Sequence, residues 1–302
     1  MSKHIVSVSL GSSGRNATGS IELCGETYEI SREGHDGDIA AMRARLCELD
    51  GAVDAIGMGG CSCYLYGKNG RKYPLKAICR LATVVKQTPF VDGAAVKETL
   101  ERRVVASMEK WGLPLKGQKV LMVCGLERLG MAEALEACGA QLRFGDMMFA
   151  LGFGGAIKKL KTLHRLIAML APIVTILPFK ALYPSGSGQN KRDKRYGRHY
   201  AWADVIAGDY LYINAHLPDS LEGKVIVTNT VTPADVLELK QRGVRALITT
   251  APEIEGRSYG TNVIEALLVA MSGVKGRALS EEEYAEQIDR AGLEPRVEFF
   301  RN

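Results

Sequence analysis

The order of hydrophobic and polar positions divides the chain into two stretches, and each stretch has the pattern of an α/β unit. In the first, strand-like patterns and helical periodicity alternate. The strand-like patterns lie at 4–10, 20–31, 53–57 and 63–66, and the helical ones at 39–49 and 75–85. In the second, apolar strand cores recur at Val120–Cys124, Gln141–Phe144, Asp204–Ala207, Lys224–Thr228 and Ala246–Thr249. Helical patterns lie between most of them, which predicts a mostly parallel sheet with helices on both faces.

We therefore predict an α/β protein of two domains. A small N-terminal α/β domain is expected over residues 1–105, where it would bind the substrate. A Rossmann-like, doubly wound domain is expected over 106–302, and it would bind a nucleotide. A long insertion, about 148–200, interrupts the second domain.

This insertion contains an uncharged apolar stretch, residues 166–179. Two prolines interrupt it, and it is shorter than the roughly 20 residues that a membrane-spanning helix needs, so we expect no transmembrane segment. Basic residues precede it, so residues 158–179 have the composition of a segment that lies on a membrane surface. Burial in the fold, a lid over the active site and contact with a second subunit, giving a homo-oligomer, are the other interpretations.

Composition indicates an ordinary globular protein, with 46% hydrophobic and 24% charged residues among 302. The N-terminus lacks the pattern of a secretory signal, and the seven cysteines are scattered, so we expect a cytoplasmic protein. Cys61 and Cys63 have no second ligand pair at zinc spacing, and we predict no metal site. The formal charge of +5 suits a small anionic substrate and does not by itself indicate nucleic acid, which we do not expect as a partner.

The strand pattern at 119–124 runs directly into Gly125 and Gly130 and then into a helical pattern. This is the order of a nucleotide-binding strand, turn and helix. Asp146 follows Gly125 at the distance where dinucleotide-binding folds place the acid that binds a ribose diol. Glu127 would repel a pyrophosphate and Arg128 would offset that charge or pair with it, so an ordinary turn without a nucleotide is the alternative.

Ligands of open α/β sheets bind beyond the carboxyl ends of the strands, so polar residues there are the candidates. For NAD or NADP, with NAD favoured by a free carboxylate, the candidates are Gly125, Arg128, Gly130, Asp146, Asn229, Thr230, Thr250, Gly256, Arg257 and Asn262. Arg143 and the basic run at 191–198 leave NADP open. In the first domain, Asp92 and Lys97 form a workable acid/base pair for moving an alcohol proton.

The order of these parts resembles the quinate/shikimate dehydrogenase family. More closely, Val6–Ser13, Thr88–Gly93, Thr99–Arg102, Gly130–Ala134 and Gly256–Asn262 resemble bacterial proteins labelled quinate 5-dehydrogenase. The resemblance implies hydride transfer to or from a hydroxylated anionic substrate between the domains. Asp92-Gly93 matches part of the family's Asn-Thr-Asp-Gly motif, but its lysine motif is absent, so Lys76 and Lys97 are substitutes by position.

We therefore expect an NAD(P)-dependent oxidoreductase of the quinate/shikimate dehydrogenase type. Asp92 and a lysine would exchange the hydroxyl proton. The alternatives are a non-catalytic regulatory protein that binds a nucleotide or another small ligand, and a peripheral membrane protein that uses residues 158–179.

Overall fold

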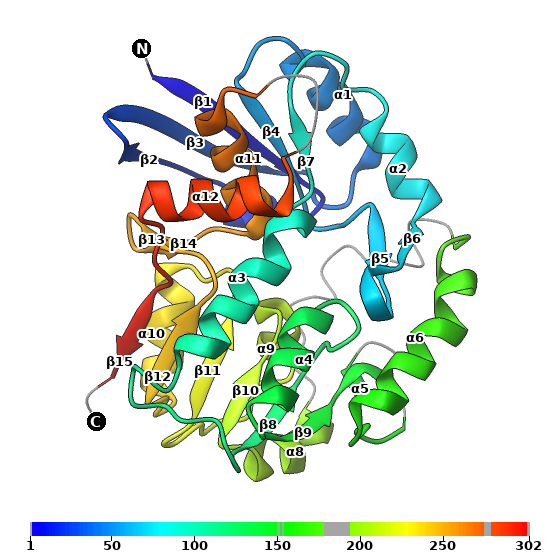
Figure 1. Cartoon of the computed structure of the whole chain (residues 1–302), viewed down its shortest axis with the longest axis vertical. Helices are drawn as coiled ribbons and strands as arrows, with labels where there is room; N and C mark the ends of the chain where they lie inside the picture. Colours follow the sequence, from blue (N-terminus) through cyan, green and yellow to red (C-terminus); the bar gives the residue numbers. More distant parts are fainter. Residues whose placement is uncertain (1, 150–151, 153, 178–193, 275–278, 301–302) are drawn as a thin grey trace.

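The computed structural model describes residues 2–149, 152, 154–177, 194–274 and 279–300, which form two α/β units, one above the other in Figure 1. In chain order the elements are β1 Lys3–Ser9, η1 Ser13–Arg15, β2 Ala17–Leu23, β3 Glu26–Gly34, α1 Ile39–Leu49, β4 Ala55–Gly59, β5 Tyr64–Tyr66, η2 Lys68–Gly70, β6 Lys72–Pro74, α2 Lys76–Ala82, β7 Phe90–Val91, α3 Ala94–Ser107, β8 Lys119–Met122, α4 Leu129–Ala137, β9 Gln141–Phe144, α5 Asp146–Phe149, α6 Leu160–Val174, η4 Lys194–Tyr196, α8 Gly197–Trp202, β10 Val205–Ala207, α9 Tyr210–Ala215, β11 Val225–Thr228, α10 Pro233–Gln241, β12 Ala246–Thr249, β13 Glu253–Ile254, β14 Arg257–Ser258, α11 Thr261–Ser272, α12 Glu281–Ala291 and β15 Val297–Phe299.

The first unit is built on a five-stranded sheet in the order β2-β3-β1-β4-β7. All neighbours are parallel except β2, which is antiparallel to β3. Successive side chains of a strand point to opposite faces. Val6 and Val8 of β1 therefore pack in the core under α1 and α2, whereas Ile5 packs in the core that contains α11. The single strand expected over 20–31 is two strands, because Cys24 and Gly25 adopt φ angles of 53° and 79° and reverse the chain.

The second unit has a six-stranded sheet in the order β15-β12-β11-β10-β8-β9. Its first five strands along the chain are parallel, and only β15 is antiparallel. Residues of α3, α4 and α6 form the core on one face, and residues of α8, α9 and α10 form the core on the other. The predicted α/β class, with two units and mostly parallel sheets, is confirmed.

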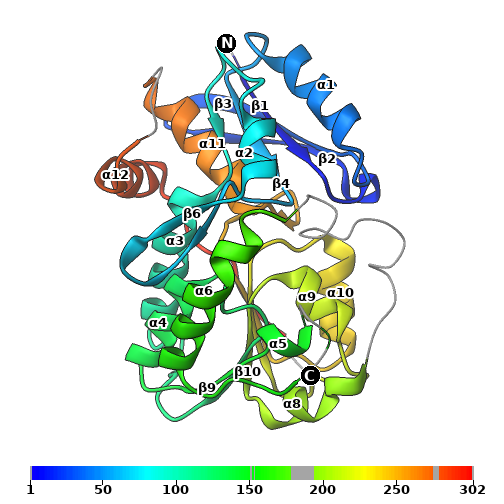
Figure 2. The same cartoon turned by 90° about the vertical axis from the view of Figure 1, so that its right-hand side faces the viewer.

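The chain crosses between the two units three times. It passes down through α3, returns after β12 to form α11 and α12 against the first unit, and passes down again to β15. Figure 2 shows α11 beside β1 and β4 of the upper unit. The division at residue 105 therefore differs from the structure in one respect, because residues 261–291 return to the first unit.

The α6 helix is the longest element in the described part of the predicted 148–200 insertion. Leu160, Leu163 and Ile167 are buried against the second unit, whereas Met169 and Ile173 are 64% and 56% exposed. The apolar stretch 166–179 is thus partly buried within the fold. Its last two residues, and the beginning of the basic run 191–198, lie outside the described residues. An oligomer through this stretch, a membrane-surface role for 158–179 and a cytoplasmic location stay predictions.

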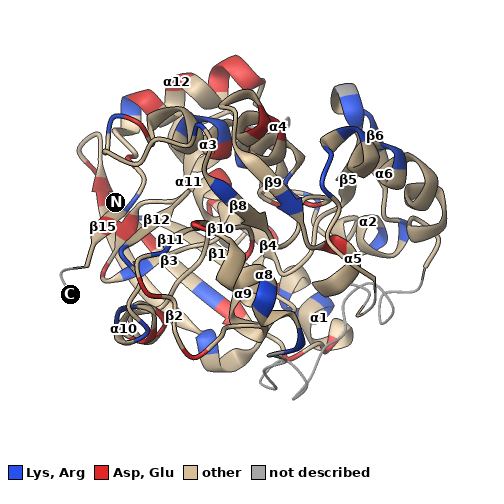
Figure 3. Cartoon of the chain, turned by 90° about the horizontal axis from the view of Figure 1, so that it is seen from below, with Lys and Arg blue, Asp and Glu red and all other residues tan. Residues whose placement is uncertain are grey.

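Within the described ranges, no helix combines the length and the apolar character that crossing a membrane would require. Charged residues of both signs are mixed over the ribbon seen from below in Figure 3. Acidic residues gather at the beginning of α12, where Glu281, Glu282 and Glu283 occupy the first turn. Negative charge at a helix N-terminus is stabilising, so this cluster has a local structural role.

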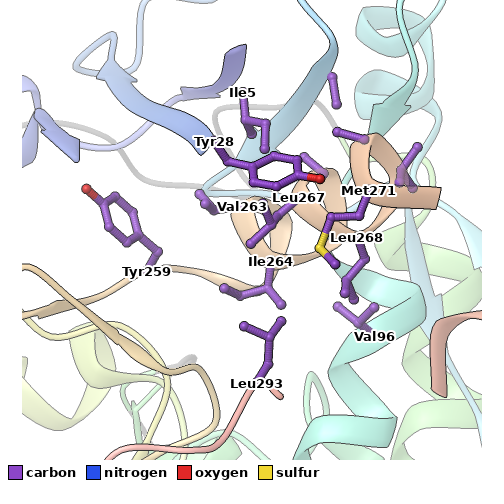
Figure 4. Packing of buried hydrophobic residues seen from close by; sticks show 14 of the residues in the cluster. Ile5, Tyr28, Val96, Tyr259, Val263, Ile264, Leu267, Leu268, Met271 and Leu293 are labelled. Carbon is purple, nitrogen blue, oxygen red and sulfur yellow. The ribbon is translucent and has the colours of Figure 1, made fainter. Parts of the chain in front are cut away.

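The α11 helix is the most deeply buried element of the first unit. Residues Thr261 to Met271 are all buried, which is the pattern of a helix enclosed on every side. Figure 4 shows Val263, Ile264 and Leu267 among the side chains of β1, β3 and α3. Gly57 of β4 allows this packing, because a Cβ there would lie 2.6 Å from the Asn262 carbonyl oxygen.

We expect Gly57→Ala to lower the free energy of unfolding by about 2–3 kcal/mol, because the added methyl group pushes α11 away from β4. Urea unfolding followed by circular dichroism measures this. Gly197→Ala is the matched control, since a Cβ at Gly197 meets open space at the beginning of α8. Its stability should be unchanged or slightly raised. Equal stability of the two variants would contradict the close packing of α11 on β4.

Candidate functional site

The carboxyl-end loops of the two sheets contact each other. Arg15, after β1, donates to the Thr230 carbonyl oxygen at 3.5 Å and pairs with Asp235 at 3.3 Å; both partners follow β11. On the other side, the beginning of α3, which follows β7, lines a cavity together with the turn after β8. In the second sheet the strand order reverses between β8 and β10, and doubly wound folds bind ligands at such a switch point.

The turn after β8 is closed by Asp146 rather than open to a nucleotide. The Asp146 carboxylate accepts hydrogen bonds from the amides of Gly125 at 3.1 Å and Leu126 at 2.7 Å. Its side chain is buried, and burial raises its pKa to about 6 despite these two bonds. The acid expected to bind a ribose diol thus occupies amide groups that a pyrophosphate would need.

The two glycines of the predicted fingerprint have packing roles. A Cβ at Gly125 would lie 2.8 Å from side-chain atoms of both Leu163 and Phe144. A Cβ at Gly130 would lie 3.0 Å from the side chain of Glu98, so this glycine brings α4 close to α3. Neither glycine is explained by the approach of a cofactor.

Arg128 is the centre of a buried ionic group. Its guanidinium pairs with Glu101 of α3 and, at 3.2 Å, with Asp209 at the beginning of α9. Arg128 is 4% exposed and Glu101 is fully buried. Burial disfavours the charged form of Asp209, but Arg128 and the Asn229 amide, which donates to it at 2.8 Å, keep its pKa below the usual value. The predicted residues Arg128 and Asn229 therefore meet through Asp209.

A small cavity opens beside this ionic group, and we call it the α3 cavity. Its enclosed volume is about 20 Å³, which holds one water-sized group. Its polar lining is Tyr66, Lys97, Glu98, Glu101, Glu127 and Arg128, and its apolar lining is Ala94, Leu126 and Leu129.

Two polar atoms of this lining are buried without a hydrogen-bond partner among the described residues, Oε2 of Glu101 and Nε of Arg128. Burial disfavours the charged forms of Glu98 and Glu101 and raises their pKa values, while the charges of Arg102 and Arg128, respectively, oppose this effect. Glu127 is exposed to solvent and lines the open side of the cavity.

Asp92 and Lys97 lie at the beginning of α3, but Asp92 makes structural contacts. Its carboxylate accepts from the amides of Cys63 at 2.7 Å and Ala94 at 3.0 Å, so it joins the loop after β4 to the first turn of α3. Lys97 lines the α3 cavity. Lys76 is exposed at the beginning of α2, and its backbone amide donates a hydrogen bond to the Thr175 carbonyl oxygen just after the end of α6. The structure thus brings Lys97, but not Lys76, to the cavity.

The remaining predicted residues are spread over the carboxyl edges. Thr230 and Arg257 meet through Arg15, because Arg257 donates to the Arg15 carbonyl oxygen at 2.8 Å. Gly256 forms the turn between β13 and β14, with a φ of 78°. Asn262 donates to the Ser7 hydroxyl at 2.7 Å inside the first unit.

Thr250 lies elsewhere, in a separate groove beside α3 and α12. Its hydroxyl is buried there and has no partner among the described residues. The predicted cofactor residues therefore do not form a single site.

Three members of the site, Glu101, Tyr66 and Asp209, are not among the residues predicted for it. Asp209 follows Gly208 directly at the end of a strand, and Glu101 lies on the helical pattern after Asp92, so both had a signal in the sequence. Tyr66 had none, because only the packing of β5 places it at the cavity.

Two family models match the chain. One, described as a domain of unknown function (DUF8754), matches residues 95–300, and another, described as a domain of unknown function (DUF8753), matches residues 4–92. No curated protein matches the chain.

Among solved structures, the chain is similar to a galactofuranose-binding protein at 9% identity, covering 97% of this chain and 98% of the other, with a TM-score of 0.35. A solute-binding protein from Burkholderia graminis C4D1M in complex with D-arabinose has 10% identity, covers 98% and 95%, and has a TM-score of 0.38. L-tryptophan dehydrogenase from Nostoc punctiforme has 12% identity, covers 97% and 79%, and has a TM-score of 0.34. Similarity at this level assigns no ligand to the chain.

These findings correct the resemblance to quinate/shikimate dehydrogenases and the oxidoreductase function that it implied. Neither family model is described as a dehydrogenase, and several of the similar structures are sugar-binding proteins rather than quinate dehydrogenases. The physical reason lies in the turn after β8, where Asp146 and Arg128 are engaged by the protein itself. Binding of NAD or NADP stays a prediction.

We expect Arg128→Met to lower the free energy of unfolding by about 3–5 kcal/mol, because it leaves Glu101 buried without its charged partner. Chemical denaturation measures the difference. Arg43→Met replaces an exposed arginine of α1 and should change stability by less than about 0.5 kcal/mol. If Arg128→Met lowers the free energy of unfolding as little as the control does, the ion pairs of Arg128 do not contribute to stability.

Glu265 of α11 provides a prediction for pH dependence. It is 4% exposed and accepts from the Tyr284 hydroxyl at 2.8 Å; burial, and after it the charge of Asp92, raise its pKa from 4.5 to about 7. Because the folded protein holds this proton more tightly, its contribution is full below pH 4.5 and is lost as the pH rises toward 7. Glu265→Gln should therefore stabilise the protein by about 2 kcal/mol more at pH 8 than at pH 5.

Urea unfolding at both pH values measures this difference. Glu109→Gln, at an exposed position just after α3, is the control and should give the same stability change at both. A stability change of Glu265→Gln that does not depend on pH would contradict a raised pKa at Glu265.

Proposed function

Since the chain belongs to the family described as a domain of unknown function (DUF8754), which names no activity, we propose a function from the geometry of the site: the protein binds a small, neutral, hydroxyl-rich molecule between its two units. One hydroxyl group of this molecule enters the α3 cavity. The observation that carries the proposal is the pair of buried, unpartnered atoms there, Oε2 of Glu101 and Nε of Arg128.

The hydrogen-bonding roles of these two atoms determine which chemical group of a ligand can bind them. The Glu101 carboxylate oxygen accepts a hydrogen bond, whereas the Arg128 Nε–H donates one. A hydroxyl group donates and accepts at once, so its chemistry matches a pair made of one acceptor and one donor. A carboxylate only accepts and an ammonium group only donates, so each would leave one buried atom without a partner, which costs about 1–3 kcal/mol.

The open side of the cavity also carries both a hydrogen-bond donor and an acceptor. Lys97 is a donor and Glu127 an acceptor there, and Glu98 lines the same space. Neighbouring hydroxyl groups of a sugar or polyol match such an alternation of donors and acceptors. Most of the molecule would lie outside the enclosed volume of about 20 Å³, against Lys97 and Glu127.

Charge favours a neutral ligand over the anionic one expected from the composition. The cavity has three carboxyl groups, Glu98, Glu101 and Glu127, against two cations, Lys97 and Arg128. One carboxyl group and one of these cations are already paired with each other. The remaining two carboxyl groups and one lysine would not favour the approach of an anion.

To test the proposal, we would titrate the purified protein by calorimetry with D-galactose, L-arabinose, D-ribose, ribitol, myo-inositol and, as an anionic analogue, quinate. We expect at least one neutral compound to bind and quinate to bind more weakly. In Lys97→Ala and Glu127→Ala the affinity should fall at least tenfold, about 1.4 kcal/mol, because each loses a contact with the ligand.

Lys110→Ala and Glu109→Ala are the matched controls, since both positions are exposed just beyond the far end of α3. They should bind like the unchanged protein. No binding of any neutral compound, or binding that Lys97→Ala and Glu127→Ala leave intact, would mean that the α3 cavity holds only water.

A further inference from the structure

Three arginines from distant parts of the chain meet at the carboxyl edge of the first sheet, and we call them the arginine cluster: Arg15 of η1, Arg32 of β3 and Arg257 of β14. Arg257 donates to the Arg15 carbonyl oxygen at 2.8 Å. Arg32 donates to the Ser12 carbonyl oxygen at 3.0 Å, on the loop that leads into η1. All three side chains are half-buried.

The cluster has more positive charge than the protein neutralises. Arg15 pairs with Asp235 at 3.3 Å. In the part of the chain that the structure describes, Arg32 and Arg257 form no ion pair with a carboxylate. Asp36 lies near Arg32 without pairing with it, and its negative charge partly offsets that of Arg32 while it accepts from the Ser13 amide at 2.8 Å.

Two of the three arginines, Arg32 and Arg257, have lowered pKa values. Burial, and after it the charges of Arg15 and Arg257, lower the pKa of Arg32 to about 10. Burial also lowers the pKa of Arg257, and Arg15 adds to this effect. Like charges held together in a partly buried place are unfavourable unless an anion joins them.

The guanidinium groups keep donors free for such an anion. The three hydrogen bonds that Arg32 donates go to neutral oxygens of Ser9, Ser12 and Asn16. Among the described residues, Arg257 donates only through Nη1 and Arg15 only through Nη2. Their remaining N–H groups are not among the buried atoms without a partner, so they reach solvent.

The glycine at position 11 makes room for one member of the arginine cluster. A Cβ at Gly11 would lie 3.0 Å from Nη2 of Arg32, so the missing side chain makes room for that guanidinium against the loop. The loop therefore holds Arg32 in position instead of leaving it extended into solvent.

We propose that the arginine cluster binds a phosphate group. Three guanidinium groups exceed the two nearby carboxylates, Asp235 and Asp36, by one positive charge, which favours an anion. Phosphate oxygens also fit the two-pronged geometry of guanidinium, which lysine lacks. The phosphate is either the free ion or part of a phosphate monoester. The site uses none of the residues of the α3 cavity.

The test compares inorganic phosphate, glycerol 3-phosphate and chloride at equal ionic strength, with thermal unfolding and calorimetry as readouts. We expect phosphate or its monoester to raise Tm by roughly 2–4 °C relative to chloride. Arg32→Gln and Arg257→Gln should each bind at least tenfold more weakly. Tighter binding of the inorganic ion would indicate free phosphate, and tighter binding of glycerol 3-phosphate would indicate an ester.

Stability without phosphate separates binding from a purely structural role. In phosphate-free buffer, Arg257→Gln should be as stable as the unchanged protein or more stable, because repulsion within the cluster is relieved. Arg43→Gln and Glu127→Ala should keep the full response to phosphate. The proposal is overturned if phosphate acts no differently from chloride, or if Arg257→Gln loses stability and still responds to phosphate.

Discussion

Burial of α11 in the first unit is the interaction on which the rest of the structure depends. Six large aliphatic side chains of this helix are buried, and at roughly 1.5–3 kcal/mol each their burial amounts to about 9–18 kcal/mol as an upper estimate. The whole net stability of a typical domain is about 5–15 kcal/mol. The first sheet therefore cannot do without a helix that the chain supplies after the second sheet is complete. Because the chain must return for it, both units are held with their carboxyl edges in contact.

In the turn after β8, groups that were expected to bind a nucleotide have partners within the protein. The turn's amide groups at Gly125 and Leu126 are taken by Asp146, and its arginine is taken by Glu101 from α3. Arg128 thus joins the second sheet to the crossing helix. The groups that can still bind a ligand lie beside this ion pair, where one hydrogen-bond donor and one acceptor have no partner among the described residues.

The positions of the strands in the second sheet could be predicted from the sequence, because they depend on the local pattern of hydrophobic residues. The buried strands of the second sheet could be located because parallel strands are continuous apolar runs, as in Ala246–Thr249. The return of α11 could not, because an apolar helix packs equally well on either sheet as far as its own residues are concerned. The spacing of Asp146 from Gly125 was identified correctly, and the structure shows that this spacing also lets the Asp146 carboxylate bind the turn itself. Arg257 was a candidate from the sequence, but its meeting with Arg15 and Arg32 had no sequence signal, because the three are 17 and 225 residues apart and only the fold brings them together.

The three crossings also bear on how the chain is made. A ribosome releases the five strands of the first sheet long before it has synthesised α11, so one face of that sheet has no cover while most of the second unit emerges. Apolar side chains such as Ile5 and Ile30 are exposed during that interval, and unpaired surface of this kind is prone to aggregate. The five parallel strands of the second unit, by contrast, are all synthesised before α11. The N-terminal residues of this protein are thus synthesised first, but their packing is completed only after more than 200 further residues have been made.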